Sequence, residues 1–485
     1  MSYRRFAVRR FAVAWMAGAL ALAGCAVGPD YRRPETPLPA RWGNASEPGI
    51  SMESADLARW WTAFKDPVLD SLVERAVRSN PDLRLAEARI REARATRAAT
   101  AAGAWPGVDV SGSYTRSRSS EHGSVSRSQG NATQPSQSLG VEQDLFRTGF
   151  DASWEIDFFG RVRRSVEAAD ALIEATVEDR RNALVTLLGE VARSYVDLRG
   201  FQQRLAVTRA NFKAQQDTLE LTRVRFTAGL ASDLDVARAE SQVNTTAAQI
   251  PVLEAAIKQA AHRLDVLLGS EPGALWSELS KEAPTPTLPP EALVGLPSEL
   301  LRRRPDIRGA ERRLAAATAQ VGAATADLFP RFSLTGAFGL QSVSASDWWS
   351  APSRFWSIGP TLRWPVFDAG RIRANIEVRN AQQEQALRQY EKTILTALEE
   401  VENALVSYAR EQARHRSLLA AVAANRRAVE MANELYLRGL NDFLNVLDAQ
   451  RSLYAAENDL AQSRAAMASN LVALYKALGG GWDID

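Results

Sequence analysis

The sequence GRVR at residues 160–163 recurs as GRIR at residues 370–373, and each copy opens a long stretch without proline. The two stretches, 161–228 and 371–438, cover 68 residues each and are rich in Ala, Leu, Glu, Arg and Gln, which are good helix formers. At a rise of 1.5 Å per residue, each stretch could form one helix roughly 100 Å long. Ordinary globular helices are much shorter, so the chain is expected to be built on two long rods.

The two rods belong to an internal duplication. Further landmarks at the same offset of 210 residues are Gly229-Leu230 with Gly439-Leu440 and Leu268-Gly269 with Leu478-Gly479. Upstream, NPDL at 80–83 matches RPDI at 304–307 with an offset of 224. The difference of 14 residues falls between positions 106 and 160, so only one loop differs in length. Composition alone does not hold Gly and Pro in register, and each half is therefore expected to form the same structural unit.

Each unit is expected to contain a leading helix, a strand hairpin, a long helix, a tight turn and a returning helix. The expected leading helices are 82–104 and 305–328, and the expected returning helices are 233–268 and 444–478. A returning helix stacked end to end on a leading helix nearly matches one long helix, which predicts a wall of parallel rods. Pro251 should kink the first returning helix, whereas its counterpart Ala461 should not interrupt the second.

Four strands are expected, at about 108–118, 145–158, 331–341 and 355–367. Between Phe150 and Phe158, aromatic and aliphatic side chains alternate with Asp, Ser and Glu, a pattern typical of strands in membrane β-barrels. A soluble sheet with one buried face would give the same pattern. Pro360 and Pro365 weaken the fourth strand locally. Four strands cannot close a pore, and lipid tolerates no open sheet edge, so a membrane location would require several copies to share one barrel.

The N-terminus predicts export and a lipid anchor. Residues 1–24 carry four Arg, then an apolar run too short to span a bilayer, and are expected to be a signal peptide. Cys25 is the only cysteine and follows Leu-Ala-Gly, which resembles a bacterial lipobox; the alternative is an ordinary signal peptide with an incidental cysteine. Without residues 1–24 the net charge changes from +2 to −2, which argues against a nucleic-acid partner.

A set of short motifs connects the chain with a known family. The motifs are GPDY at 28–31, WWTAFKDPVL at 60–69, NPDL at 80–83, RRPDI at 303–307, PVFDAGR at 365–371 and LGGGW at 478–482. Together they resemble the TolC-like outer-membrane factors, in particular the NodT-type lipoprotein branch of resistance-nodulation-division efflux systems. The resemblance implies a mainly α fold with a transmembrane portion: a homotrimer whose shared twelve-stranded β-barrel joins a periplasmic α-helical barrel.

The resemblance also implies the division of the chain. Its parts would be a signal peptide at 1–24, a lipidated segment and equatorial wrap at 25–65, a first repeat at 66–269, a Pro-rich equatorial connector at 270–300, a second repeat at 301–479 and a C-terminal tail at 480–485. Residue 26 is Ala rather than Asp, which by resemblance to Gram-negative lipoproteins favours sorting to the outer membrane. The protein is therefore expected to sit there by its barrel and lipid, and to extend into the periplasm.

Two turns between helices are the candidate contact sites. Each has a Gly that can close one helix and Ser, Asn or Asp side chains that can cap the next, as any helical hairpin requires. The resemblance implies that these turns are tips that meet a periplasmic adaptor protein. The candidate tip residues are Arg225, Thr227, Gly229 and Leu230 in the first turn and Arg438, Gly439 and Leu440 in the second.

A candidate gate follows the second turn. The resemblance places the closing constriction on Leu444 and Asp448, which are spaced i, i+4 and share one helix face. In a trimer they would form a ring of Leu and a ring of Asp. Without the resemblance, the same spacing would equally describe two residues on a packed helix face.

No catalytic motif is present in the sequence, and the three histidines, at 122, 262 and 415, are scattered. The expected function is a passive exit duct for small molecules such as drugs, driven by an inner-membrane pump, with no cofactor except the lipid on Cys25. Alternatives are a duct for metal ions or for secreted protein, or a lipid-anchored tether without a pore. The tether explains the long helices but leaves the alternating strands unexplained.

Overall fold

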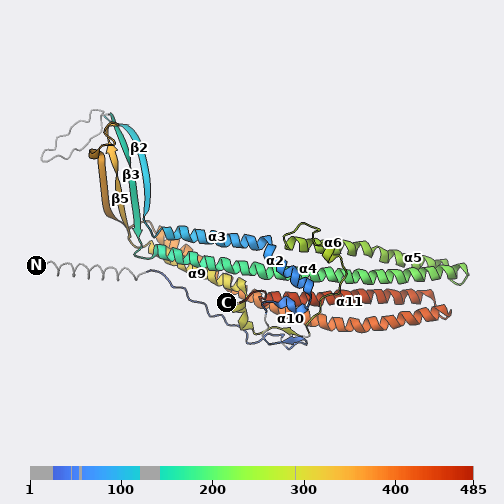
Figure 1. The fold of residues 1–485 in the computed structure, drawn as a ribbon. Coiled ribbons are helices and arrows are strands. Elements are labelled where there is room, and N and C mark those ends of the chain that lie inside the picture. The colour runs from blue at the N-terminus through green and yellow to red at the C-terminus, as the bar shows by residue number, and fades with distance from the viewer. Residues whose placement is uncertain (1–25, 45, 54–56, 121–141, 290, 484–485) are drawn as a thin grey trace, which may run out of the picture. The chain divides into compact units, whose positions relative to one another are not determined.

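The computed structural model describes residues 26–44, 46–53, 57–120, 142–289 and 291–483 (Figure 1). Residues 1–24 and Cys25, the expected signal peptide and lipidation site, lie outside the described residues. The chain divides into two compact units. The first comprises Met1–Arg33, Glu92–Ile173 and Arg312–Leu387, and the second Pro34–Arg91, Glu174–Glu311 and Arg388–Asp485.

The helices repeat in the predicted order. The first repeat contains α3 (Pro81–Ala102), α4 (Arg161–Thr227), α5 (Asp233–Ala247) and α6 (Gln249–Leu267). The second contains α9 (Pro305–Ala326), α10 (Arg371–Leu437) and α11 (Phe443–Ala477). The two long helices, α4 and α10, have 67 residues each. The predicted mainly helical, duplicated fold is therefore confirmed.

The two repeats differ at the proline. α5 ends at Ala247 and α6 begins at Gln249, so the first returning helix is interrupted just before Pro251. The Pro ring lacks an N–H and clashes with the carbonyl four residues earlier, but both are tolerated in a first helical turn. α11 runs without a break through Ala461 over 35 residues. The predicted asymmetry is confirmed.

Returning and leading helices meet end to end within the second unit. The Asn80 side chain donates to the Leu267 carbonyl at 2.9 Å, and Arg304 donates to the Ala477 carbonyl at 2.9 Å. These two contacts are equivalent in the duplication, since Arg304 corresponds to Asn80 and Ala477 to Leu267. Each satisfies a carbonyl that a helix C-terminus leaves without an intrahelical partner. The predicted end-to-end stacking is confirmed.

The strands form one antiparallel sheet in the order β2-β3-β5-β6. Their bounds are β2 (Gly107–Arg118), β3 (Glu142–Ile156), β5 (Arg331–Ser342) and β6 (Arg354–Arg363). The fourth strand ends before Pro365, so the expectation that it continues to 367 was wrong. Pro365 cannot donate to a ladder and restricts the residue before it. Pro360 lies within β6, which is tolerated because β6 is an edge strand.

The sheet is fastened to the leading helices in the same way in both repeats. The indole of Trp154 donates to the Ala104 carbonyl at 2.9 Å, and the indole of Trp364 donates to the Leu328 carbonyl at 3.0 Å. Ala104 and Leu328 follow the last residues of α3 and α9, where helical carbonyls lack partners. The duplication therefore extends to the joint between helix and sheet.

Shorter elements surround the middle of the second unit. They are β1 (Ile50–Ser51), the 3-10 helix η1 (Trp60–Phe64), α2 (Pro67–Ser79), α7 (Trp276–Leu279), β4 (Ala292–Leu293), η2 (Pro297–Glu299) and α8 (Leu300–Arg303); η3 (Ala351–Ser353) belongs to the first unit. β1 and β4 pair in parallel, so the N-terminal segment and the Pro-rich connector touch. The connector contains the short helix α7 as well as extended chain.

The main hydrophobic core joins these shorter elements to the long helices. Its most buried large side chains include Phe64, Leu188, Tyr195, Leu405 and Tyr408, all at most 1% exposed. The core thus lies on one face of α4, α10 and α11. None of the helices among the described residues combines the length and the apolar character that crossing a membrane requires.

Candidate functional site

The first candidate tip is a closed turn between α4 and α5. The Leu230 amide donates to the Arg225 carbonyl at 2.8 Å, and Gly229 has a φ of +73°, which is the usual Gly-based helix ending. Ser232 then caps α5 through reciprocal bonds with Asp235, at 3.2 Å and 3.1 Å. Leu230 is 67% exposed. Backbone hydrogen bonds and the capping box close the turn, and Leu230 projects from it into the surroundings.

The second candidate tip repeats this geometry between α10 and α11. The Leu440 amide donates to the Leu435 carbonyl at 2.9 Å, and Gly439 has a φ of +74°. The side-chain oxygen of Asn441 accepts from the Asp442 amide at 3.0 Å and from the Asn445 side chain. Asp442, at the N-cap position, makes no side-chain capping bond. Leu440 is 70% exposed, so both tips end in an exposed leucine.

A small core cluster holds the two hairpins together above their tips. Its members are Leu219, Ala239, Val243, Ala432, Tyr436, Phe443, Val446 and Leu447. The Arg225 guanidinium lies over the Tyr436 ring at 4.5 Å, and this ring packs on Phe443 at 5.6 Å. Arg225 therefore contributes to joining the hairpins, a contact that the sequence did not reveal.

Leu444 and Asp448 both lie on an open face of α11. Leu444 is 51% exposed and Asp448 is exposed, whereas Phe443, Val446 and Leu447 form the packed face. In this chain, the pair therefore does not belong to a packed helix face. The two side chains remain available to line a space that other elements or copies enclose.

The duplication reveals two further residues at the same level. Leu234 and Arg238 stand 210 positions before Leu444 and Asp448, and Leu234 is 56% exposed. α5 and α11 are in contact there, because Arg451 donates to the Gln242 side chain at 2.7 Å. The sequence analysis placed the gate on Leu444 and Asp448 alone, and the offset of 210 is the signal that identifies Leu234 and Arg238.

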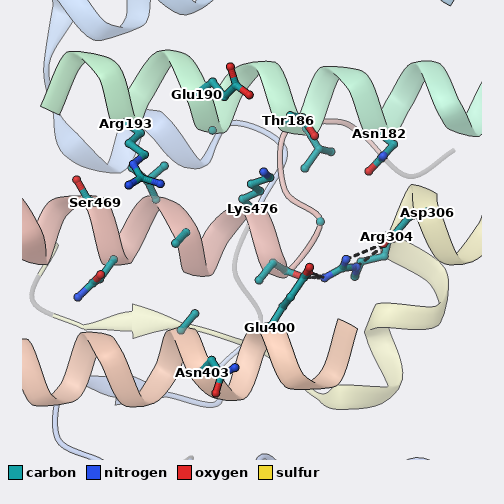
Figure 2. Close-up of a pocket in the computed structure, with 18 of the residues that line it drawn as sticks. Asn182, Thr186, Glu190, Arg193, Arg304, Asp306, Glu400, Asn403, Ser469 and Lys476 are labelled. Atoms are coloured by element: carbon teal, nitrogen blue, oxygen red, sulfur yellow. Dashed lines mark hydrogen bonds and ion pairs between the residues drawn. The ribbon is translucent and has the colours of Figure 1, made fainter. Parts of the chain in front are cut away.

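A cavity of about 690 Å³ lies between α4, α10 and α11 at the start of α9 (Figure 2). α4 contributes Asn182, Thr186 and Arg193 to its wall, and α11 contributes Ser469 and Lys476. Leu188 and Tyr475 of the main core lie on other faces of α4 and α11, whereas Ala404, Val472 and Ala477 belong both to the core and to the cavity wall. The cavity therefore marks the face of the helix wall that the shorter elements leave uncovered.

An ion cluster closes one end of this cavity. Arg304, only 8% exposed, contacts both carboxylate oxygens of Asp306, at 3.0 and 2.6 Å, and one of Glu400, at 2.6 Å (Figure 2). Burial opposes the charge on Arg304, but the two carboxylates outweigh burial and raise the pKa of the guanidinium. The cluster joins α9 and α10 and, through the Ala477 carbonyl, α11.

The histidines of the described residues lie apart from the sites described above. Among the described residues, no group of three His, Cys, Asp or Glu side chains is placed to hold a metal ion. His262 and His415 lie on α6 and α10, and His122 lies outside the described residues. Burial and Arg464 lower the pKa of His415, while Glu411 acts in the opposite direction.

The fold and its two hairpin ends define a class: a duplicated helical-hairpin protein that carries an open antiparallel sheet. Residues 72–270 and 296–480 match the family described as "Outer membrane efflux protein". The chain belongs to this family.

Known members resemble the chain over nearly its full length. It is 36% identical over 470 residues to nodulation protein T of Rhizobium leguminosarum bv. trifolii, covering 96% of each chain. It is 33% identical over 474 residues to the solvent efflux pump outer membrane protein SrpC of Pseudomonas putida, covering 96% of this chain and 97% of that protein. The solved structure of the outer-membrane channel OprN is 40% identical, with a TM-score of 0.85, covering 94% of this chain and 100% of that one.

Proposed function

We propose that the chain is the outer-membrane exit duct of a tripartite efflux pump for small molecules, working with a periplasmic adaptor protein and an inner-membrane pump. The observation that carries the proposal is the match to outer-membrane efflux proteins along both repeats, together with a fold that overlays on an outer-membrane channel. Such a duct is passive: it encloses a path, and the pump supplies the energy and selects the cargo.

The duct requires more than one copy of the chain. β2 and β6 form the two edges of the sheet, and neither edge is paired within the described residues. A sheet in lipid must leave no unpaired edge. Joining β6 of one copy to β2 of the next removes both edges, and three copies give a barrel of twelve strands. The proposed assembly is a homotrimer.

The exposed faces of α5 and α11 supply the gate. In a trimer, Leu234 and Leu444 would together form six leucines, and three Arg238 would alternate with three Asp448. The apolar ring resists wetting, and the alternating charges attract each other across it. Three Asp448 carboxylates alone would repel one another. With three Arg238 side chains between them, the proposed ring contains both charges, and neighbouring charges attract.

The two tips are the proposed adaptor-contacting surface. They share a Gly-closed turn and an exposed leucine, Leu230 or Leu440, flanked by Arg225 and Thr227 in one tip and by Arg438 in the other. Exposed apolar side chains rimmed by polar residues are typical of protein contact sites. A covalent lipid on Cys25 is proposed to aid delivery or assembly more than conduction.

The proposal is tested by deleting the gene in its own cell and measuring accumulation of a fluorescent efflux substrate such as ethidium. Accumulation should rise on deletion, and expression of the wild-type chain should restore it. A chain with Leu230→Asp and Leu440→Asp should reach the outer membrane normally but fail to restore efflux. Unchanged accumulation on deletion, in a cell shown to lack a second such duct, would contradict the proposed function.

A further inference from the structure

The cavity between α4, α10 and α11 lies within the second unit and is lined by one face of each helix. On α4, Thr186 and Arg193 stand seven positions apart, and on α11, Ser469 and Lys476 do the same. Residues at this spacing share one face of a helix. Figure 2 shows Arg193 pointing from α4 toward α11 and Lys476 pointing from α11 toward α4. Two positively charged side chains therefore enter the same space from opposite walls.

The carboxylates at this cavity have partners of their own. The Glu190 carboxylate is held by Arg263 of α6, and Figure 2 shows it pointing away from α11. The carboxylates of Asp306 and Glu400 are held by Arg304, at the end of the cavity that the start of α9 forms. The negative charge of the cavity is therefore concentrated at that end, or turned away from the two cations.

The charges of Arg193 and Lys476 are balanced only weakly. Arg193 reaches the Asp197 carboxylate at 4.0 Å, and both side chains are accessible to solvent, so this ion pair contributes little. The Lys476 side chain makes no ion pair with any of the described residues. It lies across α4 at Gly189, where an added Cβ would be 3.1 Å from its Cδ. The missing side chain at Gly189 lets Lys476 cross α4 about one turn from Arg193.

The rest of the cavity wall is neutral and partly apolar. Val185, Ala404 and Val472 line it and are at most 8% exposed. Asn182 and Asn403 add neutral donors and acceptors. The volume of about 690 Å³ falls within the range of cavities that bind drug-sized molecules, roughly 300–1,000 Å³. The cavity thus offers room for an apolar body beside two cations.

We propose that this cavity binds a drug-sized organic anion. Its sulfonate or carboxylate group lies between Arg193 and Lys476, and its apolar body lies against Val185 and Ala404. All of these groups belong to one chain, so binding itself requires no second copy. The site makes organic anions a class of cargo that the duct retains during passage, and this consequence rests on the proposed function.

The site is tested with the dye pyranine, a pyrene that carries three sulfonates, by fluorescence anisotropy on the full chain purified in a neutral detergent. The wild type should bind the dye saturably. Arg193→Gln combined with Lys476→Gln should weaken binding at least about tenfold, because two charge-assisted contacts are lost. Equal affinity in the wild type and this double variant would overturn the site, as would the absence of saturable binding to the wild type.

A matched pair separates the site from the overall charge of the protein. Lys258→Gln combined with Arg416→Gln removes two exposed cations outside the cavity and should leave dye affinity unchanged. The same loss in both double variants would overturn the site, because the dye would then respond only to net charge. Sodium sulfate at the concentration of the dye's sulfonates should not displace it. Displacement by sulfate would contradict the apolar half of the site.

Currents in planar bilayers distinguish this site from the proposed function. Pyranine should reduce the current through the wild type and leave that through the Arg193→Gln, Lys476→Gln variant unchanged. A wild-type channel whose current the dye does not reduce would contradict retention of anions in the duct. Dye binding by folded, inserted protein that forms no channel would support the cavity site and contradict the duct.

Discussion

At the scale of single residues, the two repeats use different chemistry at the same joint. Asn80 caps α3 through bonds to the amides of Asp82 and Leu83 and holds the Leu267 carbonyl. Arg304, its counterpart, holds the Ala477 carbonyl and adds ionic contacts to Asp306 and Glu400. The first joint contains only neutral groups and connects α3 with α6. The second joint is ionic and connects α10, through Glu400, with the ends of α9 and α11.

Replacing Arg304 should therefore destabilise the protein more than replacing Asn80. Arg304→Gln removes charge-assisted hydrogen bonds to Asp306 and Glu400 and should cost about 2 kcal/mol of unfolding free energy, because hydrogen bonds to charged groups contribute more than neutral ones. Asn80→Ala should cost about 1 kcal/mol, the usual loss for a helix cap. Denaturant unfolding of the detergent-solubilised protein measures both. Arg303→Gln, which removes a neighbouring charge outside the cluster, is the control, and equal losses for Asn80 and Arg304 would contradict the account.

Asp197 should make stability depend on pH. Burial raises its pKa, although Arg193 at 4.0 Å and Ser469 act in the opposite direction. The folded state thus holds the proton more tightly than the unfolded chain, so this contribution to stability is present below the unfolded value of 3.8 and is lost as pH rises through the folded value. Asp197→Asn should raise the unfolding midpoint at pH 7, and the gain should shrink toward pH 4. A gain that is the same at both pH values would contradict the assignment.

At this scale, the sequence predicted which helix face a residue occupies better than it predicted which side chain the residue contacts. Leu444 and Asp448 could be placed on one helix face from their spacing, and the structure leaves that face open. The contact of Arg225 with Tyr436 and that of Arg164 with Asp30 could not be inferred, because each joins residues more than 100 positions apart. Such contacts depend on how the helices pack and not on local propensity.

At the scale of elements, the first returning helix is interrupted near Pro251 and the second, α11, is continuous. Exchanging proline and alanine at the equivalent positions should exchange this difference. Pro251→Ala restores the missing donor, so residues 247–251 should join one continuous helix and their amides should exchange more slowly. Ala461→Pro should interrupt α11 in the same way, with a loss of about 3 kcal/mol. Hydrogen exchange of the two variants measures both effects. An interruption that persists in Pro251→Ala would show that packing, and not the proline, causes it.

The joint between sheet and helices should be equally sensitive in both repeats. Trp154→Phe and Trp364→Phe each remove one indole donor from a carbonyl at a helix end and should each cost about 1 kcal/mol. Thermal unfolding in detergent measures the loss. Trp105→Phe is the control because Trp105 is 74% exposed. A loss in only one repeat would contradict the equivalence of the two joints.

Helices were predictable almost to their ends, because proline-free runs and Gly-closed turns act locally. α4 and α10 end one residue before the expected limits. The predicted end of the fourth strand, residue 367, lies beyond the observed end of β6 at Arg363. The apolar alternation continues through Trp364 and Val366, but Pro365 cannot donate to the ladder. In that strand, backbone hydrogen bonding decided the boundary, and side-chain pattern did not.

At the scale of the whole molecule, the proposed duct depends on copies of the chain completing each other. One copy supplies four strands with two free edges among the described residues and two hairpins with open faces on α5 and α11. Those edges and faces are accounted for together if three copies close one barrel and bring their gate residues to a common axis. The expected strand count already indicated that several copies would share one barrel in a membrane, whereas the number three came only from the family resemblance.

Single-channel conductance in planar bilayers tests this account most directly. The wild-type protein should conduct weakly, and Leu444→Ala combined with Asp448→Ala should raise its conductance several-fold, because the proposed apolar ring and one half of the proposed mixed charge ring are removed. Leu419→Ala, an exposed leucine elsewhere on α10, should leave conductance unchanged. Absence of any channel in wild type and double variant alike, from protein shown to be folded and inserted, would contradict the duct.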